Sequence, residues 1–321
     1  MRAFQGEVRM ADVSLNDQVA VVTGARRGLG RSYALELARC GAAVVANGRQ
    51  GSDGLDELVA EIEGEGGRAV ACSSDVDTRS GGKAVVDKAL EHFGRLDIVV
   101  NNAGILRTGY FEDLADREID AILDIHLKAP VYVTQAAFPV LRENGYGRVV
   151  NTSSNTAFGM AGLAHYAAAK AGIIGLTKSL ALEGAADGIL VNCVLPNAAT
   201  PAMENDPVPG FEEDTRFVDA FMTVAGRHHA ELVAPLVAYL ASSACKLSGE
   251  AFSALGGRYA RVFYGVTEGW FSPRDAAVTP GDIADRIEEV TRIDDGFLVP
   301  NKIRDEYEAV AALFGGDRAG G

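Results

Sequence analysis

The stretch Thr23-Gly24-Ala25-Arg26-Arg27-Gly28-Leu29-Gly30 decides the fold of this chain. It follows the apolar run 19–22 and precedes a predicted helix, Leu29–Cys40, so it is a glycine-rich turn from a strand into a helix. The glycines let the backbone turn tightly and approach a pyrophosphate, whose charge the helix N-terminus stabilises. Because a strand precedes the turn and a helix follows it, the motif indicates a nucleotide site. The predicted contacts in this turn are Gly24, Arg26, Arg27, Gly28, Leu29 and Gly30.

Outward from this turn, short apolar runs alternate with amphipathic segments. Most of the runs are continuously apolar, as expected for strands that helices cover on both faces of a sheet. Such alternation predicts an α/β fold, a single Rossmann-type, doubly wound parallel sheet with right-handed crossovers. The seven strands predicted for this sheet are Gln18–Thr23, Ala42–Asn47, Arg68–Ser73, Leu96–Asn101, Arg148–Thr152, Ile189–Leu195 and Ala251–Leu255.

The pattern also predicts the domain organisation. A long, acidic, proline-containing segment follows the sixth strand, and a loop of that length is more often a functional lid than a connector. After the last strand, Thr279-Pro280 predicts a helix start, and about sixty residues would make a marginal core of their own. We therefore expect a flexible N-terminal arm (1–15), a catalytic domain (16–258) with a lid at about 197–230, and a C-terminal helical extension (259–321) with a disordered tail.

Composition excludes several classes of partner. The formal charge of −14 argues against nucleic acid or an anionic membrane as a partner, because both would repel such a surface. The four cysteines are scattered and no histidine cluster has metal-ligand spacing, so neither a disulfide framework nor a metal site is expected. No apolar run is long enough to span a bilayer and the start lacks an apolar signal core, which favours a cytoplasmic protein.

The end of the second strand distinguishes NAD from NADP. An acid there would bind the adenine ribose hydroxyls, whereas a cation favours a 2′-phosphate. This chain has Asn47-Gly48-Arg49 with no acid, and Arg26 and Arg27 of the glycine turn are expected close to where that phosphate would lie. NADP(H) is therefore preferred, with NAD(H) and ordinary surface arginines as the alternative. Further cofactor contacts are expected at the ends of the third and fourth strands, from Asp75, Val76, Asn102, Ala103 and Gly104.

Tyr166 and Lys170 indicate a proton-transfer site. They stand at i and i+4 of the predicted helix Leu163–Gly184 and so share one face. A phenol titrates near 10, and an ammonium group one turn away is expected to lower that pKa into a usable range. A serine ending the fifth strand could hydrogen-bond the same substrate oxygen.

Together these motifs resemble the short-chain dehydrogenase/reductase family over residues 16–257. The resemblance implies that Tyr166 is the general acid/base, that Lys170 lowers its pKa and binds the nicotinamide ribose, and that a serine orients the carbonyl. It also implies cofactor contacts from Pro196, Asn197 and Thr200. A closer resemblance is to the (3R)-hydroxyacyl-CoA dehydrogenase units of peroxisomal multifunctional enzymes, carried by Tyr33-Ala34-Leu35, His126-Leu127-Lys128, 195–198, 232–236 and Thr279-Pro280.

The chain departs from the family pattern at two catalytic positions. His126 stands where the family carries an Asn that helps to hold a relay water, so it is either a relay residue or a packed helix residue. Counting back from Tyr166 by the usual spacing selects Ser153, whereas aligning the strand end selects Ser154. Strand position fixes geometry more firmly than loop length, so we choose Ser154. His165 is expected to line the pocket.

These observations predict an NADP(H)-preferring enzyme that interconverts a secondary alcohol and a ketone on a bulky substrate, such as a 3-hydroxyacyl-CoA or a steroid. By resemblance it would form a homodimer or homotetramer. The alternative is a regulator that senses NADP(H) without turnover.

Overall fold

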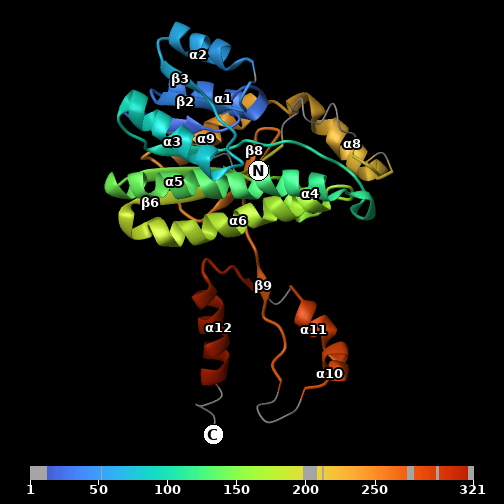
Figure 1. The fold of residues 1–321 in the computed structure, drawn as a ribbon. Helices are drawn as coiled ribbons and strands as arrows, with labels where there is room; N and C mark the ends of the chain where they lie inside the picture. The colour runs from blue at the N-terminus through green and yellow to red at the C-terminus, as the bar shows by residue number, and fades with distance from the viewer. Residues whose placement is uncertain are drawn as a thin grey trace, which may run out of the picture. The chain divides into compact units, whose positions relative to one another are not determined.

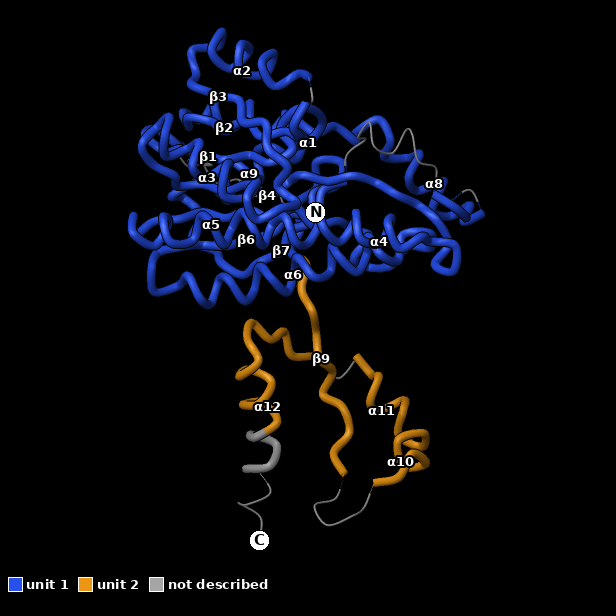
Figure 2. The backbone as a smooth tube through the Cα atoms, viewed as in Figure 1, with its two compact units in different colours: residues 1–261 blue, residues 262–321 orange. Residues whose placement is uncertain are grey.

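The computed structural model describes residues 13–51, 53–197, 208–211, 213–272, 278–293 and 296–316, with backbone alone for 311–316. Predicted site residue Thr200 lies outside these ranges, as do residues 317–321 of the tail that was predicted to be disordered over Gly315–Gly321; its first two residues are helical. The chain divides into two compact units, residues 1–261 and residues 262–321 (Figure 2).

Unit 1 is built on one sheet of eight strands in the order β3-β2-β1-β4-β5-β6-β7-β8 (Figure 1). Neighbouring strands from β3 to β7 pair in parallel. Each of the seven predicted strands is present, and the α/β doubly wound class is confirmed. Their bounds are Val19–Val22 (β1), Ala43–Gly48 (β2), Arg68–Ser73 (β3), Ile98–Asn101 (β4), Gly147–Thr152 (β5), Ile189–Asn197 (β6) and Ala251–Leu255 (β7).

The prediction of seven strands was wrong by one, because β8 (Arg258–Val262) adds an eighth strand at the edge of the sheet. Its sequence, Arg-Tyr-Ala-Arg-Val, mixes polar with apolar residues, and all five are at least partly exposed. The other strands were recognised as continuous apolar runs, which is the pattern of strands buried on both faces. β8 lacks such a run, unlike β3 at the opposite edge of the sheet, whose residues 69–72 are all apolar.

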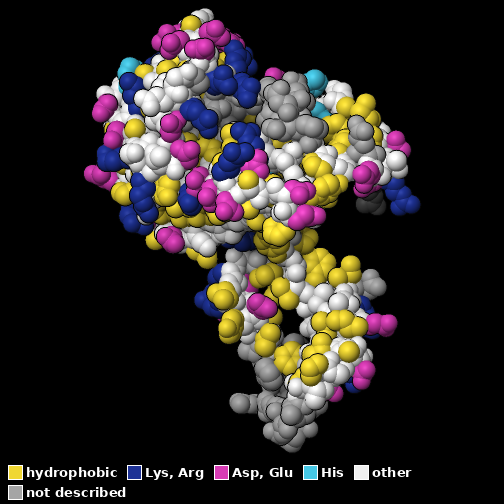
Figure 3. All heavy atoms as spheres, turned by 45° about the vertical axis from the view of Figure 1, so that its right-hand side comes forward, with side chains coloured by type: hydrophobic (Ala, Val, Ile, Leu, Met, Phe, Trp, Pro, Cys, Tyr) yellow, Lys and Arg dark blue, Asp and Glu magenta, His cyan; other side chains and the backbone are white. Residues whose placement is uncertain are grey.

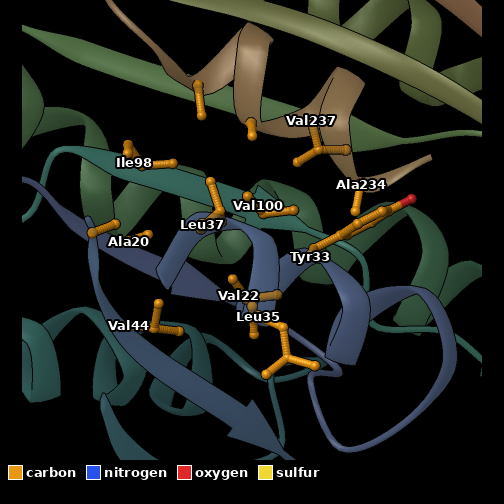
Figure 4. Close-up of a cluster of buried hydrophobic side chains, with 14 of the residues drawn as sticks. Ala20, Val22, Tyr33, Leu35, Leu37, Val44, Ile98, Val100, Ala234 and Val237 are labelled. Carbon is orange, nitrogen blue, oxygen red and sulfur yellow. The ribbon is translucent and has the colours of Figure 1, made fainter. Parts of the chain in front are cut away.

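Helices cover both faces of the sheet (Figure 1). Apolar side chains of α1 (Gly28–Arg39), α2 (Leu55–Gly64) and α9 (Ala234–Ala241) pack on one face. Figure 4 shows part of this cluster, in which α1 and α9 lie against the central strands. The opposite face carries α3 (Arg79–Phe93), α5 (Ala129–Glu143) and α6 (Ala164–Gly184). Ligands of such sheets bind at the carboxyl ends of the strands where the order reverses, here between β1 and β4.

Residues 116–143 do not form one continuous α-helix. They form α4 (Asp116–Leu123), a π-helical turn (Asp124–Lys128) and α5. Such turns are rare and frequently occur at functional sites. The wide turn carries His126, so the interruption changes the direction in which this side chain leaves the helix.

The described start of the chain belongs to the core. Leu15, which was assigned to the flexible arm, is fully buried, and its N–H donates to the carbonyl of Cys40 at 2.8 Å. After β6, the described part of the predicted lid contains α8 (Thr215–Val224). Short 3-10 turns lie at Phe111–Asp113, Asn155–Phe158, Ala185–Asp187, Ala225–Arg227 and Ala230–Leu232.

Unit 2 contains three helices among its described residues, α10 (Pro280–Asp285), α11 (Ile287–Thr291) and α12 (Ile303–Gly316). Helix α10 begins at the predicted Thr279-Pro280, where Thr279 Oγ1 accepts from the amide of Asp282 at 3.3 Å. A short antiparallel pair, β9 (Val266–Thr267) with β10 (Phe297–Leu298), was not predicted. Apolar side chains are exposed in this unit (Figure 3), with Ile303 at 76% and Tyr307 at 70%. In neither unit does a described helix have the length and apolar character needed to cross a bilayer.

Candidate active site

One cavity of about 1600 Å³ lies at the carboxyl ends of the strands in unit 1. Every predicted catalytic or cofactor-binding residue that the structure describes lines it, from the glycine turn to Tyr166 and Lys170. Its volume exceeds the roughly 300–1,000 Å³ of a usual single-ligand pocket. The cavity therefore has room for two ligands side by side.

The glycine turn is shaped by close backbone contacts. Gly24 and Gly28 have left-handed backbone angles (φ +65° and +57°), which favour glycine. A Cβ at Gly30 would lie 2.2 Å from the carbonyl oxygen of Gly24. Helix α1 then begins with an Arg27 N-cap that makes no side-chain cap and has no acid in its first turn. The first amides of α1 are thus available to an anion in the cavity.

Two side chains tie this turn to the end of β4. Thr23 Oγ1 accepts from the amides of Asn102 and Ala103 at 2.9 and 3.0 Å. Asn102 Nδ2 donates to the carbonyls of Thr23 and Gly24 at 3.0 and 3.3 Å. The sequence analysis assigned Asn102 to cofactor contact and gave Thr23 no role. In the structure, both hold the two sides of the switch point together.

At the far end of the glycine turn the cavity is basic. Arg26 is half-buried, while Arg27 and Arg49 are exposed, and all three line the cavity. Asn47 is a structural residue, because its amide donates to the carbonyls of Cys72 and Ser74 at 3.0 and 3.1 Å. Arg26, Arg27 and Arg49 are therefore the charged side chains that the glycine turn and the end of β2 contribute to the cavity wall.

Tyr166 lies beside Ser154, just beyond the carboxyl end of β5. Burial raises the pKa of Tyr166 to about 12, and a hydrogen bond with Ser154 lowers it in part. Lys170 was expected from the sequence to lower the pKa of Tyr166. That expectation was wrong for this structure, because burial of the phenol raises its pKa. Ser153 points elsewhere, since its hydroxyl donates to the carbonyl of Lys170 at 2.7 Å. Of the two serines, Ser154 is the one beside the phenol.

Lys170 is buried at the end of β5. Its Nζ donates to the carbonyl of Thr152 at 2.7 Å and lies 5.6 Å from the centre of the Tyr166 ring. Burial lowers the pKa of Lys170 to about 8. The ammonium form still predominates at pH 7.

His126, from the π-helical turn, packs edge-on against Tyr166 with ring centroids 4.8 Å apart. Its Nε2 lies 2.6 Å from the carbonyl oxygen and 3.2 Å from the amide nitrogen of Ile105. The shorter contact assigns the proton to Nε2. Nδ1 is then a buried acceptor, and it has no partner among the described residues. Burial and the charge of Lys170 lower the pKa of His126 well below its usual value, so the ring is neutral.

The position of His126 also explains why residue 104 is a glycine. A Cβ at Gly104 would lie 2.4 Å from His126 Cε1. His126 therefore packs directly on the backbone that ends β4. This contact joins a side chain that is predicted to be catalytic to the strand end that is predicted to contact the cofactor.

The comparison with protein families decides the identity of this arrangement. The model for short chain dehydrogenases matches residues 18–209, which span the sheet from β1 to β6 together with the glycine turn, Tyr166 and Lys170. The chain belongs to the short-chain dehydrogenase/reductase family. It is therefore an oxidoreductase that acts on CH–OH groups with NAD(P).

Relatives support the same assignment. A short-chain type dehydrogenase/reductase of Mycobacterium tuberculosis is 41% identical over 286 residues, covering 86% of this chain and 95% of that protein. The peroxisomal multifunctional enzyme type 2 of Drosophila melanogaster is 41% identical over 241 residues, covering 72% of this chain and 38% of the fly enzyme. The solved structure of the full-length fly enzyme matches with a TM-score of 0.76 and 31% identity, over 94% of this chain and 50% of that one.

The cavity of this short-chain dehydrogenase also has lining residues that were not predicted from the sequence. Phe211, Phe217 and Phe221 line the cavity, as do Phe158 and Met160. The spacing of two phenylalanines by four residues in 217–221 was a helical signal within the predicted lid. His165 was expected to line the cavity and is not among its lining residues; it is buried in α6. The described residues contain no group of His, Cys, Asp and Glu side chains that could hold a metal.

Proposed function

We propose that this short-chain dehydrogenase interconverts a secondary alcohol and a ketone on a bulky substrate, a 3-hydroxyacyl-CoA in the first instance, with NADP(H) preferred. The observation that carries the proposal is that Ser154, Tyr166 and buried Lys170 line the cavity that also contains the glycine turn. The resemblance to hydroxyacyl-CoA dehydrogenase units, and the similarity to the fly enzyme, support the substrate class.

The residues present fit a dinucleotide. The glycine turn leaves a space that a Cβ would fill, and the open amides of α1 suit a pyrophosphate. The other residues proposed to hold the cofactor are Arg49, Asp75, Val76, Asn102, Ala103, Gly104, Pro196 and Asn197, all of which line the cavity. When bound, the nicotinamide supplies or accepts a hydride at its C4 carbon.

Each catalytic side chain has a proposed role in reduction. Tyr166 holds its proton at neutral pH, because its pKa is raised, and donates it to the oxygen of the reduced carbonyl. The Ser154 hydroxyl orients that oxygen. Lys170, held by the carbonyl of Thr152, places a positive charge behind the phenol as it gives up its proton. The lone pair of His126 Nδ1 is the proposed acceptor in the relay that returns a proton from solvent.

The cofactor preference predicts the effect of Arg49→Ala. A charge-assisted hydrogen bond to a phosphate contributes about 1.5–3 kcal/mol. The variant is therefore expected to bind NADPH on the order of tenfold to a hundredfold more weakly, with NADH affinity unchanged. Fluorescence titration of both proteins with both coenzymes measures this. Tighter binding of NADH than of NADPH by the unmodified enzyme would contradict the preference.

The pH dependence of the reductive rate follows from the raised pKa of Tyr166 and the lowered pKa of Lys170. The pKa of Tyr166 is raised to about 12, so the phenol stays protonated, and Lys170 loses its charge as pH rises through about 8. Reductive kcat/KM is expected to be level near pH 7 and to fall above about pH 8. In Lys170→Arg the fall should move to higher pH, because arginine keeps its charge. A reductive rate that climbs steadily to pH 9 would contradict these assignments.

Turnover tests the proposed substrate class. Oxidation of NADPH is followed by absorbance with 3-oxobutanoyl-CoA and, separately, with a steroid ketone. Turnover of the thioester alone supports the hydroxyacyl-CoA assignment, and turnover of the steroid alone overturns it. The lid at 197–230, the homo-oligomer and the cytoplasmic location stay predictions from the sequence.

A further inference from the structure

An aromatic cluster lies at one end of the catalytic cavity. Phe211, Phe217 and Phe221 contact one another edge-on, with ring centroids 5.2, 5.6 and 6.3 Å apart. Phe221 touches both other phenylalanines and also the ring of buried His228, at 4.7 Å. All three phenylalanines line the same cavity as Tyr166. The cluster is therefore part of the catalytic cavity and has Phe221 at its centre.

Helix α8 carries two of these three phenylalanines, of which Phe217 is exposed and Phe221 is half-buried. Asp214 caps the helix, because its Oδ1 accepts from the amide of Phe217 at 3.0 Å. Phe217 and Phe221 follow one turn apart and share a face. None of the residues of α8 is buried, and Phe217 is 40% exposed. Large aromatic side chains on an uncovered helix face lose the free energy of burial unless a ligand covers them.

The charged side chains around the cavity indicate which ligand groups can bind beside the aromatic cluster. Glu213 and Asp214 line the cavity next to the aromatic cluster, whereas the arginines line it by the glycine turn and β2. Figure 3 shows hydrophobic and acidic side chains together on the part of unit 1 that carries α8. An anionic group would be repelled beside these two carboxylates. A neutral, apolar group is favoured there.

We propose that Phe211, Phe217 and Phe221 form a binding site for the apolar tail of the substrate, an alkyl or aryl chain attached on the far side of the reacting carbonyl. The proposal rests on the proposed function in one respect, which is that the carbonyl reacts at Tyr166. The site makes the enzyme selective for long tails. Each methylene that leaves water on these rings is expected to raise kcat/KM by about fourfold, until the cluster is covered.

Kinetics with two tails tests the site. 3-Oxobutanoyl-CoA and 3-oxododecanoyl-CoA share their head group and differ only in the tail. In Phe221→Ala, kcat/KM for the long thioester is expected to fall on the order of tenfold to a hundredfold, and that for the short thioester to change less than about twofold. Met222→Ala is the matched control, because Met222 is the next residue of α8, is 64% exposed and is not among the cavity-lining residues. Equal losses for both tails in Phe221→Ala would overturn the proposal, as would a wild-type enzyme without tail preference.

Direct binding separates this proposal from the proposed function. Isothermal titration with 2-dodecanone, which has a tail and no anionic head, needs no turnover. Binding that weakens at least about tenfold in Phe221→Ala and is unchanged in Met222→Ala supports the tail site, even if neither thioester reacts. That combination would overturn the hydroxyacyl-CoA assignment alone. If 2-dodecanone does not bind, or binds equally to all three proteins, the tail site is overturned. Thermal unfolding of each variant shows whether the fold is retained.

Discussion

Tyr166→Phe is expected to lower kcat on the order of a hundredfold to ten-thousandfold while leaving coenzyme affinity unchanged. The variant keeps the aromatic ring against His126 and loses only the hydroxyl that contacts Ser154. A positioned general acid contributes a rate factor in this range. Steady-state kinetics and coenzyme titration, made on the same preparation, measure the two quantities separately.

Tyr132→Phe is the matched control for this change. Tyr132 lies in α5 with Arg79 over its ring at 5.0 Å, and it is not among the residues lining the cavity. Removing its hydroxyl should leave kcat unchanged. A Tyr166→Phe enzyme that keeps full turnover would contradict the catalytic assignment and would favour the alternative of a regulator that only senses the coenzyme.

The second large effect is expected for Gly30→Ala. The new Cβ would lie 2.2 Å from the carbonyl oxygen of Gly24 and 2.5 Å from Nδ2 of Asn102, so the backbone of the glycine turn must move. The shift disturbs the two hydrogen bonds that Asn102 donates to this turn. We expect a loss of stability of about 1–3 kcal/mol. We also expect kcat/KM to fall on the order of a hundredfold, because a displacement of about 1 Å misplaces the bound coenzyme.

Gly64→Ala provides the comparison for a glycine with free space. Gly64 is the last residue of α2, and a Cβ there would meet no heavy atom within 4 Å. The change should be neutral or stabilise the protein by up to about 0.5–1 kcal/mol, since alanine restricts the unfolded chain. Urea unfolding and NADPH titration of both variants provide the test. If Gly30→Ala retained wild-type coenzyme affinity, the assignment of the turn to the pyrophosphate would be wrong.

Local sequence patterns were sufficient to predict the α/β class, the seven strands β1 to β7, the glycine turn and the placement of Tyr166 and Lys170 on one helix. These features are local, because glycine content, continuous apolar runs and i, i+4 spacing follow directly from the order of residues. The prediction that these distant motifs meet also follows from local signals, since the carboxyl ends of parallel strands share one edge of the sheet.

Only the tertiary structure decided the features that depend on packing. It placed Ser154 rather than Ser153 beside the phenol, and it showed that burial raises the pKa of Tyr166 where a nearby ammonium was expected to lower it. It also revealed the π-helical turn under His126 and the aromatic cluster that faces the cavity. Burial, desolvation and side-chain direction are set by neighbours distant in the chain, so no local pattern carries them.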